Sequence, residues 1–332
     1  MITLAHGIGG RLMRELIRDI FAKHFGTINN TIDSTADAAL LPHFEGDALF
    51  TTDGFIVDPL EFPGGDIGTL AVHGTVNDLA VSGATPRFLA VTCLIEEGFE
   101  IARLERIAAS LGRTAHDCGA AIVAGDTKVL PRGQGGGLYL SVSGIGSRNP
   151  GAPPGLASIK PGDVILVSGT LGDHGTAILL ARHEFGLHGD LISDCASVIP
   201  FTRAAEAYAG LRFMRDPTRG GIATVANEIS LATNCLVTLD ERKLPLHEQV
   251  HGICDMLGYD PLYLACEGRV VAVIASVQAA SLLAAWRALP GGQHAAIVGQ
   301  VAAGRARVVL RTALGGERIL DELEDDPLPR IC

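Results

Sequence analysis

A dense run of glycine and proline residues near the middle of the 332-residue chain constrains its fold more than any other feature. Residues 146–162 include the tripeptides NPG and PPG. Such chain breakers end regular structure and are typical of connections between domains. We therefore predict one domain over residues 1–150, a second over residues 151–315, and a mobile, charged and proline-containing tail over residues 316–332.

Hydrophobic periodicity predicts helices and strands in both domains. In the first domain it predicts helices at about 10–24, 67–81 and 101–118, and strands at 48–57, 87–94, 120–124 and 138–145. In the second it predicts a helix around 178–180, helices at 222–231, 247–256 and 279–289, and strands at 164–167, 236–239, 270–274, 296–298 and 308–310. The order is mixed rather than strictly βαβ, which predicts an α/β (α+β) fold with mixed sheets.

The charge balance restricts the classes of partner. The chain has 26 basic and 37 acidic residues, a net charge of -11, so it lacks the broad cationic surface that attracts nucleic acid or anionic lipid. We expect no nucleic acid and no membrane among its partners. Residues 1–7 show neither the basic segment nor the apolar run of a secretory signal peptide, so we expect a cytoplasmic protein.

Seven cysteines are present, without a C-x-x-C pair or a His/Cys cluster at zinc spacing. We expect six of them to be buried apolar residues. The seventh, Cys332, is the last residue of the sequence. From the sequence alone, its thiol is either incidental or a functional group at the end of the tail.

Four aspartates stand beside small or apolar residues: Asp37, Asp53, Asp78 and Asp216. Carboxylates in such positions either converge on hard cations, which prefer oxygen ligands, or cap helices and turns. Neither a G-x-x-x-x-G-K-[ST] loop nor a strand–G-x-G-x-x-G–helix pattern is present. The two common nucleotide-binding fingerprints therefore do not apply.

Several motifs along almost the whole chain resemble one superfamily. They occupy residues 5–11, 62–68, 74–84, 125–128, 168–175, 216–221, 267–268 and 328–332. This set is similar to the AIR-synthase (PurM-like) superfamily of ATP-dependent enzymes, and within it to the family of carbamoyl dehydratases that mature [NiFe]-hydrogenases. The resemblance implies a two-domain PurM-like fold with a flexible C-terminal tail.

The resemblance also implies an ATP site with Mg²⁺ ions that bridge the phosphates to aspartates. The positions matching the metal ligands are Asp37, Asp53, Asp78 and Asp216. The positions matching nucleotide contacts are Gly7, Gly9, Gly10, Asp53, Asp66, Asn77, Asp126, Thr218 and Arg219. Where the superfamily often has paired aspartates this chain has Ala36 and Asp37, which leaves the number of metal ions open.

The catalytic residues implied by the resemblance are Cys332, Glu267, His73 and Lys128. Cys332 would carry the substrate, Lys128 would supply charge at the phosphates, and Glu267, with His73 as a helper, would take protons from the amide nitrogen. On sequence alone Glu267 is equally compatible with a solvated turn. His73, on an Ala/Val-rich helix, is also compatible with a hydrogen-bonded core histidine.

In the family that the chain resembles, HypF places a carbamoyl group on the terminal thiol, ATP drives its dehydration to a thiocyanate, and the cyanide passes to iron held by HypC–HypD. The resemblance therefore implies these partners and a homodimer. Two alternatives remain open: a superfamily enzyme acting on a diffusing small molecule, and a non-enzymatic carrier with a terminal thiol. Loss of the tail would leave turnover intact in the first, and ATP would not be consumed in the second.

Overall fold

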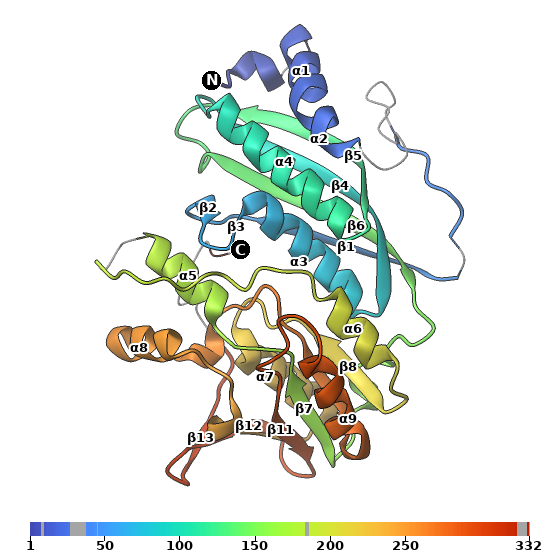
Figure 1. Cartoon of the computed structure of the whole chain (residues 1–332), viewed down its shortest axis with the longest axis vertical. Coiled ribbons are helices and arrows are strands. Elements are labelled where there is room, and N and C mark those ends of the chain that lie inside the picture. The colour runs from blue at the N-terminus through green and yellow to red at the C-terminus, as the bar shows by residue number, and fades with distance from the viewer. Residues whose placement is uncertain (8–9, 27–37, 45, 183–185, 324–330, 332) are drawn as a thin grey trace. The chain divides into compact units, whose positions relative to one another are not determined.

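The computed structural model describes the whole chain except residues 8–9, 27–37, 45, 183–185, 324–330 and 332 (Figure 1). The chain divides into two compact units. The N-terminal unit comprises residues 1–79 and 84–148, and the C-terminal unit comprises residues 80–83 and 149–331. Both units mix helices with mixed sheets, which confirms the predicted fold class.

The N-terminal unit begins with helical segments over residues 4–25 and is built on a four-stranded sheet of order β1-β6-β4-β5. Its elements are η1 (Leu4–Gly7), α1 (Arg11–Leu16), the π-helical η2 (Ile17–Ala22), α2 (Lys23–Phe25), β1 (Ala48–Phe55), β2 (Glu61–Phe62), β3 (Gly65–Asp66), α3 (Ile67–Val81), β4 (Ala84–Glu96), α4 (Ile101–Asp117), β5 (Ala121–Leu130) and β6 (Leu138–Arg148). β4 and β5 are parallel and are joined through α4, while β6 is antiparallel to β1 and β4.

Helices α3 and α4 lie against one face of this sheet (Figure 1). The amphipathic α4 buries Leu104, Ile107, Ala108 and Leu111 on that side. The side chains that the sheet turns toward the helices are also buried, among them Leu89, Val91 and Val142. The opposite face exposes Phe50 and Thr52 of β1. One face of the sheet is therefore the core of the unit, and the other lies at its surface.

The C-terminal unit is built on a seven-stranded sheet of order β13-β12-β9-β11-β7-β10-β8. Its elements are η3 (Leu156–Ser158), β7 (Asp163–Val167), α5 (Asp173–Arg182), α6 (Ile199–Glu206), β8 (Leu211–Arg215), α7 (Gly221–Thr233), β9 (Leu236–Asp240), η4 (Glu241–Lys243), α8 (Glu248–Leu257), η5 (Pro261–Tyr263), β10 (Val271–Ala275), α9 (Ser276–Arg287), β11 (Ala296–Ala302), β12 (Arg307–Arg311) and β13 (Glu317–Ile319).

Both faces of the C-terminal sheet are buried, which explains why β10 is a continuous apolar run. Val271 and Val273 pack into the core under α7, whereas Ala272 and Ile274 pack under α6 and α9. The Trp286 indole N–H donates to the Phe201 carbonyl at 2.9 Å, which joins α9 to α6. This sheet supplies the rigid base for the polar groups described below.

The C-terminal segment departs from the expected mobile tail over residues 316–332. Glu317–Ile319 form β13, which pairs with β12, and Leu320 is buried. The reason is that β12 offers an edge with unpaired backbone groups, and even three polar residues can pair with it. The regular structure of the unit therefore includes residues assigned to the tail.

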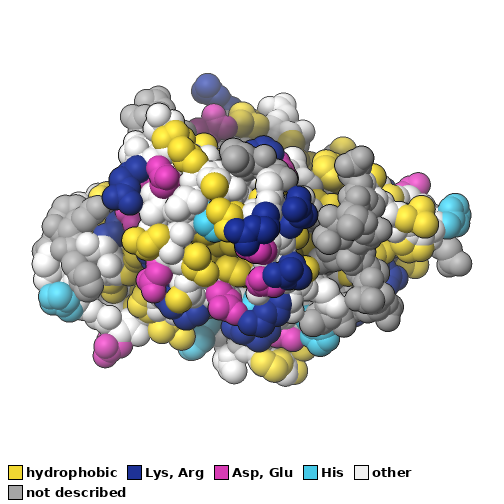
Figure 2. Space-filling model, turned by 90° about the horizontal axis from the view of Figure 1, so that it is seen from above, with side chains coloured by type: hydrophobic (Ala, Val, Ile, Leu, Met, Phe, Trp, Pro, Cys, Tyr) yellow, Lys and Arg dark blue, Asp and Glu magenta, His cyan; other side chains and the backbone are white. Residues whose placement is uncertain are grey.

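Of the six described cysteines, Cys93, Cys235, Cys254 and Cys266 are buried as expected, and Cys118 and Cys195 are partly exposed. In the part of the chain that the structure describes, no helix is long and apolar enough to cross a membrane. On the face of the molecule shown in Figure 2, lysine and arginine side chains alternate with acidic and hydrophobic ones.

Candidate active site

Two of the predicted metal ligands lie on the helix-covered face of the N-terminal sheet. The Thr51 hydroxyl donates to Asp78 Oδ2 at 2.9 Å, so β1 and α3 meet at this point. Asp53 is two residues further along β1 and therefore points to the same face as Thr51. Its Oδ1 accepts the Gly54 N–H at 2.7 Å. The fold thus places the Asp53 and Asp78 carboxylates on the same, helix-covered side of the sheet.

Asp126 and Lys128 lie on the opposite face of the same sheet. The register runs from Asp53 through Val142 and Val91 to Gly125, so Asp126 belongs to the next row and points the other way. Lys128 Nζ lies 3.2 Å from Asp126 Oδ1 and 3.1 Å from Oδ2, and both side chains are exposed. A ligand on one face of this sheet would therefore contact either Asp53 and Asp78 or Asp126 and Lys128, but not both pairs.

His73 and Asn77 occupy successive turns of α3. Asn77 is buried, and His73 Nδ1 lies 3.8 Å from Cys118 Sγ. Burial lowers the pKa of His73 to about 4, with the Asp117 carboxylate acting weakly in the opposite direction. The imidazole is therefore neutral at pH 7. Its burial and its thiol neighbour favour a core histidine, and its role as a helper in proton transfer stays a prediction.

Asp66 has a structural role at the start of α3. Its Oδ1 accepts the Thr69 N–H at 2.9 Å, and Thr69 Oγ1 accepts the Asp66 N–H at 2.9 Å. This reciprocal pair is a capping box, which satisfies donors at a helix N-terminus. Asp66 Oδ1 also accepts the Ser110 hydroxyl at 2.7 Å, which ties α3 to α4. If Asp66 also contacts a nucleotide, as predicted, its carboxylate must do so while it accepts these hydrogen bonds.

The glycines ahead of α1 differ in their surroundings. A Cβ on Gly7 would lie 2.7 Å from the Val129 backbone nitrogen, so close packing on β5 requires a glycine there. Gly10 precedes α1 and has open space around its Cα. Packing therefore accounts for Gly7, while phosphate binding at Gly10 stays a prediction.

In the C-terminal unit, Asp216 and Glu267 lie at the same end of two paired strands. β8 ends at Arg215, which pairs with Val271 of β10, and the Cys266 N–H donates to the Pro217 carbonyl at 3.0 Å. Both carboxyl side chains are buried. The Thr218 carbonyl accepts the Gly221 N–H at 3.0 Å. Arg219, in the same loop, is exposed.

The main chain at Glu267 is held by Asp194. Asp194 Oδ1 accepts the Glu267 N–H at 3.1 Å, and Arg269 Nε lies 3.3 Å from Asp194 Oδ2. Burial raises the pKa of Asp194, and the Arg269 guanidinium opposes that shift. A Cβ on Gly268 would lie 1.9 Å from the Asp194 carbonyl oxygen, so only glycine fits. Glu267, 2% exposed, is thus a fixed and buried residue rather than the solvated turn that its sequence neighbours allow.

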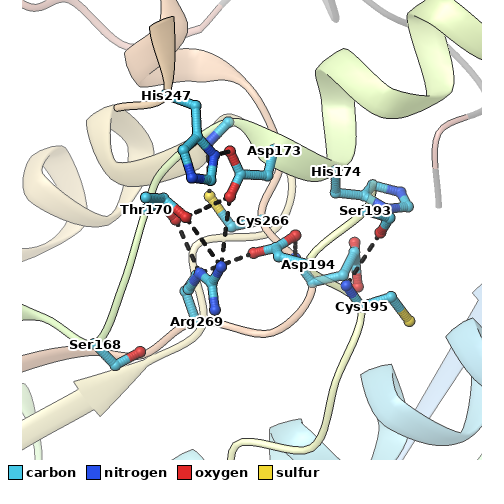
Figure 3. A network of polar contacts seen from close by, with 12 residues as sticks. Ser168, Thr170, Asp173, His174, Ser193, Asp194, Cys195, His247, Cys266 and Arg269 are labelled. Atoms are coloured by element: carbon cyan, nitrogen blue, oxygen red, sulfur yellow. Dashed lines mark hydrogen bonds and ion pairs between the residues drawn. The ribbon is translucent and has the colours of Figure 1, made fainter. Parts of the chain in front are cut away.

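Asp173, at the start of α5, joins this cluster from the other side (Figure 3). Its Oδ2 accepts the Thr170 hydroxyl and lies 3.4 Å from Arg269 Nη2, and its Oδ1 lies 2.9 Å from His247 Nδ1. Arg269 also donates to the Thr170 carbonyl at 2.9 Å. Arg269 therefore connects the carboxylates of Asp173 and Asp194.

His174, the next residue of α5, points away from Arg269 toward Ser193 (Figure 3). Its Nδ1 lies 2.7 Å from Ser193 Oγ, and its Nε2 lies 2.6 Å from the carbonyl oxygen of Ile331. Sequence reasoning assigned no role to His174, Ser193, Asp194 or Arg269. The only signal was that Asp173 and His174 are polar residues in the otherwise small and apolar motif at 168–175.

Three predicted site residues, Asp37, Gly9 and Cys332, lie outside the described residues. Among the residues that the structure does describe, no group of three or more His, Cys, Asp and Glu side chains is close enough to hold a metal ion. The binding of Mg²⁺ by the four predicted ligands therefore stays a prediction. Asp53 and Asp78 belong to the N-terminal unit, and Asp216 to the C-terminal unit.

Sequence profiles place the chain in a family. The profile of the AIR synthase related protein N-terminal domain matches residues 35–147, and that of the C-terminal domain matches residues 160–311. The chain therefore belongs to the AIR synthase related proteins.

Full-length relatives narrow the assignment. The chain is 46% identical to "Carbamoyl dehydratase HypE" of Rhodobacter capsulatus, over 100% of this chain and 98% of that one. It matches a crystal structure of hydrogenase maturation protein HypE in complex with ATP with a TM-score of 0.94, at 42% identity and 100% coverage of both chains. A structure of a HypE–HypF complex matches with a TM-score of 0.80, at 40% identity, covering 95% of this chain and 100% of that one. The chain belongs to the HypE family, which confirms the resemblance.

Proposed function

We propose that this chain uses ATP to dehydrate a carbamoyl group carried on the Cys332 thiol, which supplies the cyanide ligand for the iron of [NiFe]-hydrogenase. The observation that carries the proposal is the 46% identity, from end to end, with a carbamoyl dehydratase. The geometry at Glu267 supports it, because a buried carboxyl residue on a main chain fixed by Asp194 suits proton transfer at a defined position.

The reaction balances without an oxidant or reductant. Cys332 carries S–C(=O)–NH₂; the γ-phosphoryl group of ATP is transferred to the carbamoyl oxygen, and the C–O bond then breaks with phosphate as the leaving group. The nitrogen loses both protons, and the products are S–C≡N, ADP and phosphate. Glu267 is our candidate for accepting a proton from nitrogen, with His73 as a helper. Lys128 would place a positive charge at the transferred phosphoryl group.

A crystal structure of a relative in complex with ATP supports the binding of ATP by this chain. We propose Gly7, Gly9, Gly10, Asp53, Asp66, Asn77, Asp126, Thr218 and Arg219 as nucleotide contacts. Asp37, Asp53, Asp78 and Asp216 would hold Mg²⁺, which neutralises phosphate charge when bound. The donor set fits a hard cation, because Asp53 and Asp78 place carboxylates on one face of the sheet, and a carboxylate can accept more than one bond.

A homodimer would complete the nucleotide site. Asp53 and Asp78 lie on one face of the N-terminal sheet, and Asp126 and Lys128 lie on the other. On that second face Phe50 is 66% exposed, an unusual position for an aromatic side chain on a strand. Pairing of this face with a second copy would bury Phe50 and bring Lys128 of one subunit to the other. Light scattering that shows an active monomer would contradict this arrangement.

HypF is the proposed carbamoyl donor, and a HypE–HypF complex of a relative supports it. We further propose HypC–HypD as the acceptor of the cyanide, and a cytoplasmic location. The test is the mass of the C-terminal peptide after incubation with HypF, carbamoyl phosphate, ATP and Mg²⁺. The carbamoyl adduct on Cys332 should form with HypF and lose one water only when ATP is present.

Two other results would support one of the alternative functions, an enzyme acting on a diffusing small molecule or a non-enzymatic thiol carrier. Turnover that survives removal of residues 324–332 would indicate a diffusing substrate. An adduct that forms but never loses water, without ATP consumption, would indicate a passive carrier.

A further inference from the structure

The end of the tail is held in the C-terminal unit through its last described residue. Ile331 is 4% exposed, and its carbonyl oxygen lies 2.6 Å from His174 Nε2. This carbonyl belongs to the peptide bond that joins Ile331 to Cys332. Since a peptide group is planar, its oxygen lies in one plane with the nitrogen and Cα of the next residue, and the two Cα atoms are about 3.8 Å apart. A hydrogen bond to this oxygen therefore holds the peptide group through which Cys332 is attached.

The direction of each hydrogen bond around His174 follows from its partners. Burial lowers the pKa of His174 to about 4, so the ring is neutral at pH 7. A carbonyl can only accept, so the ring proton is on Nε2 and points at Ile331. Nδ1 then accepts the Ser193 hydroxyl at 2.7 Å, and Ser193 Oγ accepts the Cys195 N–H at 3.0 Å. This chain of bonds selects the one neutral tautomer that can hold the tail.

The loop that orients His174 is also the loop that fixes Glu267. Ser193 bonds the imidazole, and the adjacent Asp194 accepts the Glu267 N–H at 3.1 Å. Figure 3 shows Ser193 beside the His174 ring and Asp194 beside Arg269. Two neighbouring residues of one loop therefore orient the imidazole that bonds Ile331 and fix the main chain of the candidate proton acceptor.

The start of the tail is fixed in the same unit by hydrogen bonds from side chains to its backbone carbonyls. Asn227 Nδ2 donates to the Leu320 carbonyl at 3.1 Å, and the Tyr263 hydroxyl donates to the Asp321 carbonyl at 2.7 Å. Toward the other end, Ile331 is held by the His174 hydrogen bond to its carbonyl and by the burial of its side chain.

We propose that His174 is a positioning residue, which docks the Ile331–Cys332 peptide in the C-terminal unit for the dehydration step. His174 does not touch the reacting atoms; it acts by holding the peptide that carries the thiol. The proposal deepens the proposed function and rests on it, because it concerns the placement of the carbamoylated Cys332.

The test compares His174→Gln with His174→Asn. A glutamine amide nitrogen can take the place of Nε2 and donate to Ile331, whereas that of asparagine matches only Nδ1. The first measurement needs no enzymatic activity: the rate at which a carboxypeptidase releases Ile331 from the purified full chain. We expect about tenfold faster release in the asparagine variant, and a rate near that of the unchanged chain in the glutamine variant.

The second measurement is single-turnover dehydration of the carbamoylated chain. We expect His174→Asn to lower its rate constant about tenfold, with the KM for ATP and the rate of carbamoylation by HypF unchanged, and His174→Gln to restore the rate. Equal rates for the two variants, or an equal loss of ATP affinity, thermal stability and rate in both, would overturn the proposal. If the unchanged chain performs no dehydration, the proposed function fails, while the release of Ile331 still reports on docking.

A tail variant keeps the test valid if substitutions at the buried His174 unfold the protein. Ile331→Ala changes only the tail and should also slow dehydration several-fold and speed carboxypeptidase release. Where the His174 variants do fold, a double-mutant cycle between His174→Gln and His174→Asn should show a smaller effect of Ile331→Ala once the His174 contact is lost. Full additivity, or no effect of Ile331→Ala on either rate, would show that the docking contact is irrelevant.

Discussion

The two units hold their candidate functional groups in opposite ways. In the N-terminal unit, Asp126 and Lys128 are exposed and pair mainly with each other, and Asp53 and Asp78 are only partly buried. In the C-terminal unit, Glu267 and Asp194 are buried and are fixed by a network through Arg269. An open, charged surface suits a nucleotide that must enter and leave with its counter-ions, whereas a buried, hydrogen-bonded cluster suits the precise placement of a reacting group.

The largest effect is expected in the buried cluster. Glu267→Gln preserves the N–H that Asp194 accepts but removes the carboxylate, so dehydration should slow roughly 10³-fold if Glu267 takes the proton from nitrogen. ATP affinity, measured by calorimetric titration, should stay within a factor of about two. Glu228→Gln, in α7, is the matched control and should retain the rate. A Glu267→Gln rate close to that of the control would remove Glu267 from the mechanism.

The next effect concerns the stability of the C-terminal unit. Gly268→Ala would place a Cβ 1.9 Å from the Asp194 carbonyl oxygen, so the loop that holds Glu267 must move. We expect a loss of roughly 3 kcal/mol in the free energy of unfolding. Gly54→Ala, on β1 with open space around its Cα, should change that free energy by less than about 1 kcal/mol. Urea denaturation compares the two; equal losses would mean that the buried cluster is no more constrained than the open surface.

A smaller effect is expected at the open surface. Asp78→Asn keeps an oxygen that can accept the Thr51 hydroxyl, so the fold should be preserved while a charge is lost. We expect Mg-ATP to bind about tenfold more weakly, with the dehydration rate at saturating ATP little changed. Asp117→Asn, at the end of α4, removes the same charge elsewhere in the unit and should bind as before. Unchanged affinity and turnover in Asp78→Asn would exclude it from the site.

A further expected effect is a pH dependence that the two units share, which is small within any single pH unit. Burial lowers the pKa values of His73 and His174 to about 4, below the usual histidine value of 6.5. Between these values the unfolded chain binds more protons than the folded one, so stability is lost as the pH falls from 6.5 toward 4. Each histidine should contribute roughly 1 kcal/mol per pH unit. Urea denaturation of His73→Gln and His174→Gln at several pH values should show a shallower slope in each; slopes equal to that of the unchanged chain would contradict the burial argument.

Much of the regular structure follows from periodicity. The predicted helix at 67–81 coincides with α3, because this segment has a single charged residue over fifteen positions and packs as a buried helix. The strand predicted at 120–124 extends to Leu130, because Gly125, Asp126 and Lys128 face solvent and interrupt the apolar pattern that marks a strand. The short β8 and α6 were missed, since two arginines interrupt the apolar pattern of β8 and a proline stands in the first turn of α6.

The candidate site, like the regular structure, could be predicted from the sequence only in part. The motifs predicted roles for Glu267 and the aspartates, which stay predictions, and they gave no role to His174, Ser193 or Arg269. Their contacts join residues far apart in sequence: His174 and Ile331 are separated by 157 positions, and Arg269 and Thr170 by 99. No local pattern encodes such pairs, because each side chain alone is compatible with an ordinary core or surface residue.

The most direct test of the account follows the carbamoyl oxygen. A carbamoyl group labelled with heavy oxygen is placed on Cys332 by HypF, and the chain is then given Mg-ATP in unlabelled water. If the ATP phosphoryl group is transferred to the carbamoyl oxygen, the label should appear in inorganic phosphate as the C-terminal peptide loses one water, and Cys332→Ser should give neither product. Label that appears in water, or remains on the peptide while ATP is consumed, would contradict dehydration through a phosphorylated intermediate on Cys332.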